Sequence, residues 1–290
     1  MTNVRAIPEL PSRAPGAHKG DFGRVLILGG SRGMVGAAAL AGEAALRAGA
    51  GLVTIGVPAE VYPILAAQVT CCMTRPLAAT AAGTLAFAEI RALLEFAGQF
   101  DVVALGPGLG RHPETTRLVH ELARSVEKPM VIDADALNAL AEDMDVLRKA
   151  PAPRILTPHP GEMGRLAGLT TGEVQKARRN VAIWMARTHR AVFVLKGQGS
   201  IVTDGVRVRV NRTGNPGMAT GGTGDVLTGV IAALAGQGLA PFEAAVLGAH
   251  VHGLAGDIAA RKFGQVSMIA TDVLDALPEA FLKLNRRKPR

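Results

Sequence analysis

Cysteine is almost absent from this 290-residue sequence, because Cys71 and Cys72 are the only two and they are adjacent. Neighbouring thiols form neither a disulfide framework nor a zinc site. Long apolar runs are absent as well, since Gly, Arg or Glu interrupts each of them, and this excludes a membrane-spanning helix. The first 15 residues lack the apolar stretch that a secretion signal needs. These absences predict a protein of the reducing cytoplasm.

Aromatic residues are also scarce, at 3% of the sequence, although the net charge is +8. Proteins that bind nucleic acid combine aromatic stacking platforms with stripes of basic residues. Here the basic residues are dispersed, and the one dense run, residues 286–290, is terminal and is expected to be a solvated tail. Nucleic acid is therefore disfavoured. The charge indicates a basic surface or the attraction of polyphosphate ligands.

Short, nearly continuous apolar segments alternate along the chain with alanine-rich segments of helical periodicity. Strands that are buried on both faces have this composition, and the alternation predicts an α/β fold with a mostly parallel sheet flanked by helices. The predicted strands are residues 24–28, 52–57, 102–105, 130–132, 155–156 and 192–195. The predicted helices are residues 37–48, 84–96, 114–124, 173–189, 226–235, 242–260 and 271–284.

A hairpin is predicted after the last of these strands. Residues 200–203 and 206–211 flank Asp204-Gly205, which has the sequence of a type I′ turn. The chain shows no repeat and no change in composition that would mark an internal linker. The sequence therefore predicts a single domain over residues 18–290, preceded by a proline-containing lead-in over residues 1–17.

Glycine and polar residues follow the carboxyl ends of the predicted strands, which is where open α/β sheets bind ligands. These loops are residues 29–33, 106–110, 133–135, 157–162 and 196–200. A further glycine-rich run, residues 213–225, ends in Asp225 at the start of a predicted helix. Glycine amides and a helix N-terminus together make an anion-binding cradle. Asp225 beside that cradle is either a reactive carboxylate or a simple helix N-cap.

Several side chains in these loops have two interpretations. His159 is either a ligand-binding histidine or a loop histidine bonded to backbone, and Lys196 meets either a ligand anion or a structural acid. One of Asp133 and Asp135 is expected to face the pocket, while the other caps the following helix. His250 and His252 are too closely spaced to share a helix face, so packing is expected there. No GxGxxG spacing or Walker A sequence occurs.

The sequence Gly221-Gly222-Thr223-Gly224-Asp225 resembles the anion-hole motif of the ribokinase-like superfamily. Further segments resemble one family within it, the ADP-dependent NAD(P)H-hydrate dehydratases. These segments are residues 18–23, 36–52, 106–110, 133–138, 157–162, 195–197 and 214–229. The likeness extends from about residue 18 to about residue 277, and it implies a ribokinase-like three-layer sandwich with helices on both faces of a mostly parallel sheet.

The resemblance implies a lyase that repairs nicotinamide nucleotides. Such an enzyme phosphorylates the hydroxyl of the S-epimer of hydrated NADH or NADPH from ADP and then expels phosphate, leaving NAD(P)H and AMP. By this resemblance Asp225 is the catalytic base. Gly222, Thr223 and Gly224 form the anion hole for the transferred phosphoryl group.

The resemblance also implies the binding residues. The adenine nucleotide would contact Lys196, Gly197, Gln198, Gly199, Ser200 and Gly224. The hydrated dinucleotide would contact Ala37, Gly108, Gly110, His159 and Asp225. Mg²⁺ would bridge the nucleotide phosphates and reach the protein through Glu162 and water.

The implied partners are small molecules, with neither nucleic acid nor a membrane among them. A homo-oligomer, possibly a tetramer, and a separate NAD(P)H-hydrate epimerase are expected. Many relatives have an aromatic residue before the Gly-Ala pair near the first helix, whereas Met34-Val35 stand there in this chain, so local substrate packing is expected to differ. Two other functions fit the glycine-aspartate motif: a kinase of a small vitamin-precursor alcohol, and a nucleotide-binding regulatory protein in which Asp225 is only a cap.

Overall fold

The computed structural model describes residues 1–285, and the predicted solvated tail at residues 286–290 lies outside them. The strands are β1 (Thr2–Asn3), β2 (Arg24–Leu28), β3 (Leu52–Pro58), β4 (Met73–Leu77), β5 (Val102–Leu105), β6 (Met130–Ile132), β7 (Arg154–Leu156), β8 (Val192–Leu195), β9 (Ile201–Thr203) and β10 (Arg207–Val210). The α-helices are α1 (Val35–Arg47), α2 (Tyr62–Gln68), α3 (Ile90–Ala97), α4 (Pro113–Ser125), α5 (Ala134–Leu140), α6 (Pro160–Ala167), α7 (Thr171–Lys176), α8 (Arg178–His189), α9 (Thr223–Gly236), α10 (Pro241–Ser267) and α11 (Ala270–Asn285). Three 3-10 helices are η1 (Lys19–Phe22), η2 (Met144–Lys149) and η3 (Pro216–Met218).

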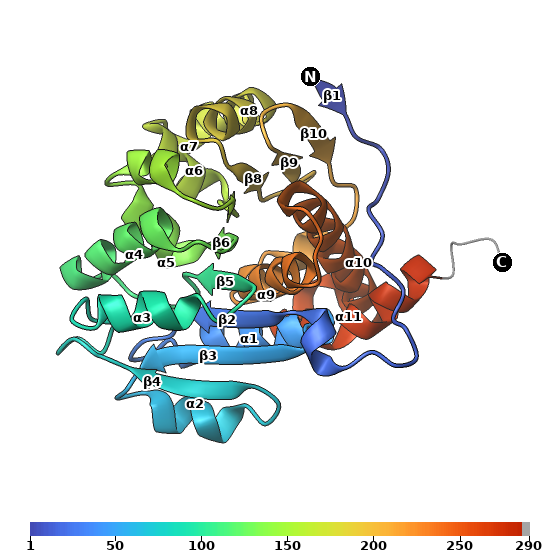
Figure 1. Cartoon of the computed structure of the whole chain (residues 1–290). Coiled ribbons are helices and arrows are strands. Elements are labelled where there is room, and N and C mark those ends of the chain that lie inside the picture. The colour runs from blue at the N-terminus through green and yellow to red at the C-terminus, as the bar shows by residue number, and fades with distance from the viewer. Residues whose placement is uncertain (286–290) are drawn as a thin grey trace.

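One ten-stranded sheet, in the order β1-β10-β9-β8-β7-β6-β5-β2-β3-β4, forms the centre of the molecule (Figure 1). Neighbouring strands from β4 to β8 are parallel, whereas β9 pairs antiparallel with both β8 and β10. Strand β1, in the lead-in segment, adds parallel to β10 at the edge. No helix within residues 1–285 is long and apolar enough to cross a membrane.

Helices cover both faces of the sheet, and each face has its own apolar core. Alternation along β2 shows this, because Val25 and Ile27 belong to one core and Leu26 and Leu28 to the other. Helices α1, α9, α10 and α11 pack on the first face, and α3 to α8 supply the second. The predicted three-layer sandwich with a mostly parallel sheet is therefore confirmed.

Most predicted elements are present, and strands β2, β5, β6 and β8 have the predicted bounds. Strand β4 and helix α2 were not predicted. The side chains of β4 are mostly exposed and include Arg75 and Pro76, so the segment lacks the apolar composition of a buried strand.

Three local predictions are wrong. The helix predicted over residues 84–96 begins only at Ile90, because Thr115 Oγ1 donates to the Leu85 carbonyl at 2.8 Å and fixes the preceding segment outside the helix. The helix predicted over residues 173–189 is divided into α7 and α8 at Ala177, where φ is −131°. The hairpin turn is not type I′, because of its two central residues only Gly205, with φ +87°, has the positive φ that this type requires at both.

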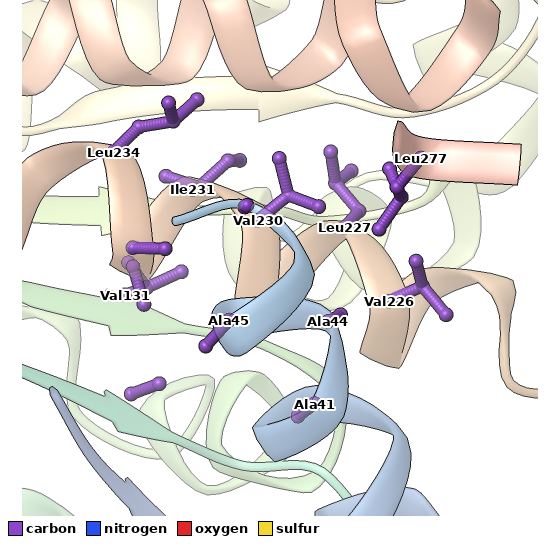
Figure 2. Close-up of a cluster of buried hydrophobic side chains, with 14 of the residues drawn as sticks. Ala41, Ala44, Ala45, Val131, Val226, Leu227, Val230, Ile231, Leu234 and Leu277 are labelled. Atoms are coloured by element: carbon purple, nitrogen blue, oxygen red, sulfur yellow. The ribbon is translucent and has the colours of Figure 1, made fainter. Parts of the chain in front are cut away.

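Helices α1 and α9 pack together through small residues (Figure 2). Ala41, Ala44 and Ala45 of α1 are fully buried. A Cβ on Gly229 of α9 would lie 2.0 Å from the Ala41 carbonyl oxygen and 2.9 Å from Ala44 Cβ. The two helix backbones therefore approach as closely as a glycine permits, and this contact fixes the position of the N-terminus of α9.

We expect Gly229→Ala to lower the free energy of unfolding by about 1–3 kcal/mol, because the added methyl group overlaps backbone that cannot move aside easily. Urea denaturation followed by circular dichroism measures the change. Gly172→Ala is the matched control, since a Cβ there would meet only Thr170 Oγ1, at 4.0 Å. It should stay within about 0.5 kcal/mol of the unmodified chain. Equal effects of the two substitutions would contradict the proposed close contact.

Candidate active site

Three adjacent parallel strands, β6, β7 and β8, end at one edge of the sheet, and predicted site residues follow their ends. Asp133 follows β6, Glu162 lies in the first turn of α6 after β7, and Lys196 follows β8. The first turn of α9 reaches the same place. A Cβ built on Gly224 would lie 3.4 Å from Lys196 Nζ and 3.6 Å from Asp133 Oδ2. The fold therefore brings these four segments together.

Helix α9 begins without a side-chain cap among the described residues. Gly222 holds the N-cap position with φ +90°, a left-handed conformation that favours glycine. The Thr223 hydroxyl is turned away from its own helix, donating to the carbonyls of Met218 at 2.9 Å and Thr220 at 3.0 Å. The first amides of the helix therefore have no partner within it, as an anion site requires.

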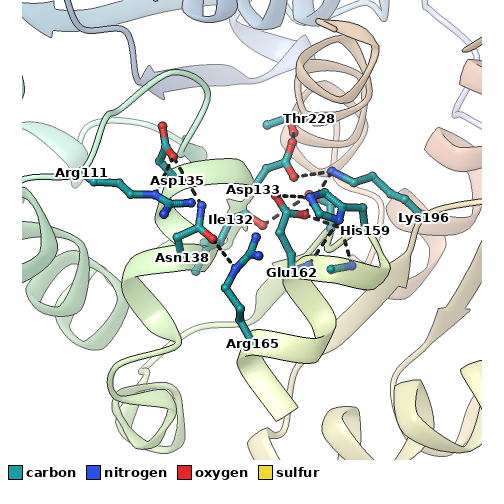
Figure 3. A network of polar contacts seen from close by, with 12 residues as sticks. Arg111, Ile132, Asp133, Asp135, Asn138, His159, Glu162, Arg165, Lys196 and Thr228 are labelled. Atoms are coloured by element: carbon teal, nitrogen blue, oxygen red, sulfur yellow. Dashed lines mark hydrogen bonds and ion pairs between the residues drawn. The ribbon is translucent and has the colours of Figure 1, made fainter. Parts of the chain in front are cut away.

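Lys196 lies between two carboxylates (Figure 3). Its Nζ is 2.7 Å from Asp133 Oδ1 and 3.8 Å from Glu162 Oε2, while Asp133 Oδ2 accepts a hydrogen bond from Thr228 Oγ1 at 2.8 Å. Burial opposes the charge of the ammonium, but Asp133 and Glu162 outweigh it and hold the pKa of Lys196 above its ordinary value. Of the two interpretations of Lys196, the one in which it meets a structural acid is confirmed, because Asp133 is that acid. The ammonium stays charged beside the N-terminus of α9.

His159 caps helix α6. Its Nδ1 accepts from the amides of Gly161 at 3.0 Å and Glu162 at 3.3 Å, and Glu162 Oε2 accepts in return from the His159 amide at 2.8 Å. The interpretation of His159 as a loop histidine bonded to backbone is thus confirmed for Nδ1. Burial and then the charges of Lys196 and Arg165 lower the pKa of His159, so the ring is neutral. Half of the His159 side chain is exposed. Contact between its ring and the substrate therefore stays a prediction.

Asp225 lies in the first turn of α9, and because Gly222 holds the N-cap position, the interpretation of Asp225 as an N-cap is wrong. Burial, and then the nearby charge of Asp133, raise the pKa of Asp225 to about 7. Lys196 acts in the opposite direction, and Asp135 and Glu162 add smaller increases. A carboxylate with this proton affinity suits general base chemistry near neutral pH.

The predicted dinucleotide-binding residues lie beside this centre. A Cβ on Gly108 would lie 3.1 Å from Ala37 Cβ, so these two are in direct proximity. The Gly110 amide donates to Asp135 Oδ2 at 2.9 Å, which also shows that Asp135 faces a loop rather than capping α5. Asp133 holds the N-cap position of α5, but its side chain does not cap the helix. Met34, which with Val35 precedes the Gly36-Ala37 pair, is 40% exposed.

The predicted nucleotide loop, residues 196–200, leads from β8 into the hairpin. Gly197 has φ +127°, and Ser200 Oγ donates to its carbonyl at 3.0 Å, which tightens the turn. Arg178 supports the loop from α8 by donating to the carbonyls of Leu195 and Lys196, each at 3.3 Å. Gln198 is exposed, whereas Ser200 is partly buried.

Sequence reasoning missed Thr228 and the hydrogen bond that His252 makes near the site. Thr228 is the hydroxyl partner of Asp133, and its position one turn after Asp225 was the available signal. His252 Nε2 lies 2.8 Å from the Thr223 carbonyl, and burial lowers the pKa of His252 to about 4, so the neutral ring supports the α9 terminus. The expectation of packing for His252 is thus confirmed. Within residues 1–285 no group of three or more His, Cys, Asp or Glu could hold a metal ion.

The family model described as NAD(P)H-hydrate dehydratase matches residues 25–279 of this sequence. The bifunctional NAD(P)H-hydrate repair enzyme of Moorella thermoacetica is 54% identical over 93% of this chain and 51% of that protein. Its counterpart in Escherichia coli is 41% identical over 92% of this chain and 49% of that protein. The chain therefore spans about half the length of the curated relatives it matches.

Solved structures give the same picture. The ADP/ATP-dependent NAD(P)H-hydrate dehydratase of Bacillus subtilis, co-crystallized with ATP and Mg²⁺, has a TM-score of 0.79 at 29% identity, and 94% of each chain is covered. The hydroxyethylthiazole kinase of Pyrococcus horikoshii has a TM-score of 0.62 at 18% identity over 94% of each chain, which shows a shared fold alone. Because the family model covers most of the sequence and full-fold likeness accompanies it, the chain belongs to the NAD(P)H-hydrate dehydratase family.

Proposed function

We propose that this protein dehydrates the S-epimer of hydrated NADH and NADPH, using ADP as the phosphoryl donor. The observation that supports this most directly is the uncapped N-terminus of α9, with the Lys196 ammonium beside it and Asp225 in its first turn. A phosphoryl group needs the amides and the ammonium, and a hydroxyl nucleophile needs the carboxylate. The first turn of α9 supplies the amides and the carboxylate, and Lys196 lies beside it.

The reaction has two steps. Asp225 takes the proton from the hydroxyl of the hydrated nicotinamide, and the hydroxyl oxygen attacks the terminal phosphorus of ADP while AMP leaves. The carbon–oxygen bond then breaks with phosphate as the leaving group, assisted by the electron pair of the ring nitrogen, and the adjacent ring carbon loses a proton to water so that the carbon–carbon double bond is restored. The amides of Gly222, Thr223 and Gly224, together with Lys196, stabilise the charge of the phosphoryl group in both steps.

Nucleotide and dinucleotide occupy opposite sides of this centre in the proposal. The loop of Lys196, Gly197, Gln198, Gly199 and Ser200, with Gly224, would hold the adenine nucleotide. Ala37, Gly108, Gly110 and His159 would hold the hydrated dinucleotide. The closeness of Ala37 to Gly108 supports a shared surface on that side.

Mg²⁺ would bind on the nucleotide phosphates and neutralise part of their charge, since Mg²⁺ prefers oxygen ligands and retains water. The protein side fits this arrangement rather than a dedicated metal cage, because within residues 1–285 no group of three or more His, Cys, Asp or Glu could hold a metal ion, and Glu162 already accepts from the His159 amide. Glu162 would therefore reach the ion only through water.

The remaining proposals concern the setting of the reaction. We place the protein in the cytoplasm and expect a homo-oligomer, possibly a tetramer. An epimerase is needed to supply the S-epimer, and that this role belongs to a separate protein stays a prediction. The Moorella thermoacetica and Escherichia coli relatives are named bifunctional and are about twice as long as this chain.

Purified protein incubated with ADP, Mg²⁺ and hydrated NADH should regain the dihydronicotinamide absorbance and release AMP and phosphate in equal amounts. A kinase of a small alcohol would instead produce a stable phosphate ester and no such absorbance. A regulatory nucleotide-binding protein would bind ADP without turnover. If the absorbance is not recovered and no AMP is formed, the proposed function is wrong.

Asp225→Asn should lower kcat by roughly two to four orders of magnitude, the usual value of a positioned base. ADP binding, measured by calorimetry, should be retained. The raised pKa means that ionised Asp225 opposes folding, so above pH 7 the variant should unfold at no lower temperature than the unmodified protein. Asp275→Asn, on the exposed face of α11, is the control and should turn over normally. Full activity of Asp225→Asn would remove Asp225 from the mechanism.

The pH dependence of kcat/KM should show an acid limb with an apparent pKa near 7, because protonated Asp225 cannot accept the hydroxyl proton. Activity is then full above this value and is lost as the pH falls through it. His252 cannot produce this limb, since its pKa is lowered to about 4. Rates that stay constant from pH 8 to pH 5 would contradict the assignment of Asp225 as the base.

A further inference from the structure

Asp133 is almost completely buried, at 1% exposure, yet it is a charged residue at the end of a strand. Its side chain does not cap the helix that follows, although it stands at the N-cap position. Both carboxylate oxygens are used elsewhere, one by Lys196 at 2.7 Å and the other by Thr228 at 2.8 Å. The carboxylate is therefore directed away from its own helix and toward the first turns of α9.

The backbone next to Asp133 is strained. Ala134, the next residue, has φ +51°, and only one other non-glycine residue within residues 1–285, Arg190, has a positive φ. Arg190 ends α8, where a left-handed residue is common, whereas Ala134 begins α5, where it is not. Strain of this kind persists where the surrounding structure requires it, and it gathers at functional sites.

The Asp133 backbone is also fixed from the neighbouring strand. Its amide donates to the Leu105 carbonyl at 3.0 Å, and a Cβ on Gly106 would lie 1.8 Å from its carbonyl oxygen. The position of the carboxylate is thus set by β5, β6 and α9 together. A side chain held this firmly, in contact with Lys196 and beside Gly224, acts on the anion cradle and not only on local packing.

We propose that Asp133 is a positioning residue of this site: its carboxylate holds the Lys196 ammonium against the first turn of α9 and supplies a fixed negative charge beside Asp225. The inference deepens the proposed function and rests on it, because it assigns Asp133 to act through Lys196 and Asp225. Asp133 itself touches neither substrate.

The charges that face Asp225 decide the direction of the effect. They are Asp133 after β6, Asp135 of α5, Glu162 of α6 and Lys196 after β8, while His252 of α10 is neutral. After burial, Asp133 is the largest influence, and it raises the pKa of Asp225. Removing its charge lowers that pKa, and a Lys196 ammonium released toward Asp225 lowers it further. Both changes therefore lower the pKa of Asp225.

Asp133→Asn tests the proposal, because the amide keeps the size of the side chain and can still bond Thr228. The acid limb of kcat/KM should move down by about one pH unit or more. The Kd for ADP with Mg²⁺ should rise severalfold as Lys196 loses its fixed position. An independent reading comes from the carboxyl carbon of Asp225, observed by NMR in protein labelled at aspartate and assigned with Asp225→Asn. Its titration midpoint should fall by the same amount.

Two controls separate charge from structure. Thr228→Val removes the other hydrogen bond of Asp133 without removing charge, so the midpoint should stay where it is. Asp135→Asn removes a more weakly coupled charge and should give a smaller downward shift. If Asp133→Asn and Thr228→Val lower stability and rate together while both acid limbs stay unmoved, Asp133 is structural and the inference is overturned.

A buried lysine left without its acid can prevent folding, and a paired substitution covers that outcome. Lys196→Met alone should move the Asp225 midpoint up, and Asp133→Asn added to it should bring the midpoint down again. If the Asp225 midpoint of the double variant equals that of Lys196→Met alone, the inference is overturned. If the unmodified protein shows no dehydration but the NMR midpoint still responds to Asp133→Asn, the proposed reaction fails while the positioning role stands.

Discussion

The contact between α1 and α9 holds the first turn of α9 at the carboxyl edge of the sheet, and the candidate site depends on that placement. Gly229 permits the approach, because any larger residue would overlap the Ala41 carbonyl. The helix begins at Gly222 without a side-chain cap among the described residues, so its first amides face the residues that follow β6 and β8. An uncapped terminus is satisfied by an anion or by water. Packing between two small-residue faces therefore decides where an anion binds.

One lysine near this terminus is shared among several acids. Lys196 meets Asp133 and Glu162, and its charge also reaches Asp225. Burial raises the pKa of Glu162 and of Asp225, and the Lys196 ammonium opposes this increase without cancelling it. The acids in turn keep Lys196 charged. The site thus combines a cation that attracts phosphate with a carboxylate that attracts a proton, and the two functions share their electrostatic cause.

The sheet was the most predictable part of the fold, because strands buried on both faces are continuously apolar and β5, β6 and β8 have that pattern to the residue. Prediction failed where burial was low or where side chains competed with the helix. Strand β4 is largely exposed, and a Thr115 hydroxyl holds the segment before α3 outside the helix. The buried Arg154 was also missed. Its guanidinium donates hydrogen bonds to the backbone carbonyls of Ala123 and Val126, and no local sequence pattern predicts these contacts.

The composition of the site was predictable and its pairings were not. Parallel strands place their following loops on one edge, so Asp133 and Lys196 were expected at the same edge of the sheet. The hydrogen-bond partner of each side chain could not be predicted, because the partner can be distant in the sequence. Thr228, for example, lies 95 positions from Asp133. The cap formed by His159 and Glu162 has the spacing of a capping box, but histidine in place of serine or threonine conceals it. Ala134 adopts a left-handed conformation that its own sequence disfavours. Local preference is therefore overridden at the residue that follows Asp133, whose carboxylate contacts Lys196 and Thr228.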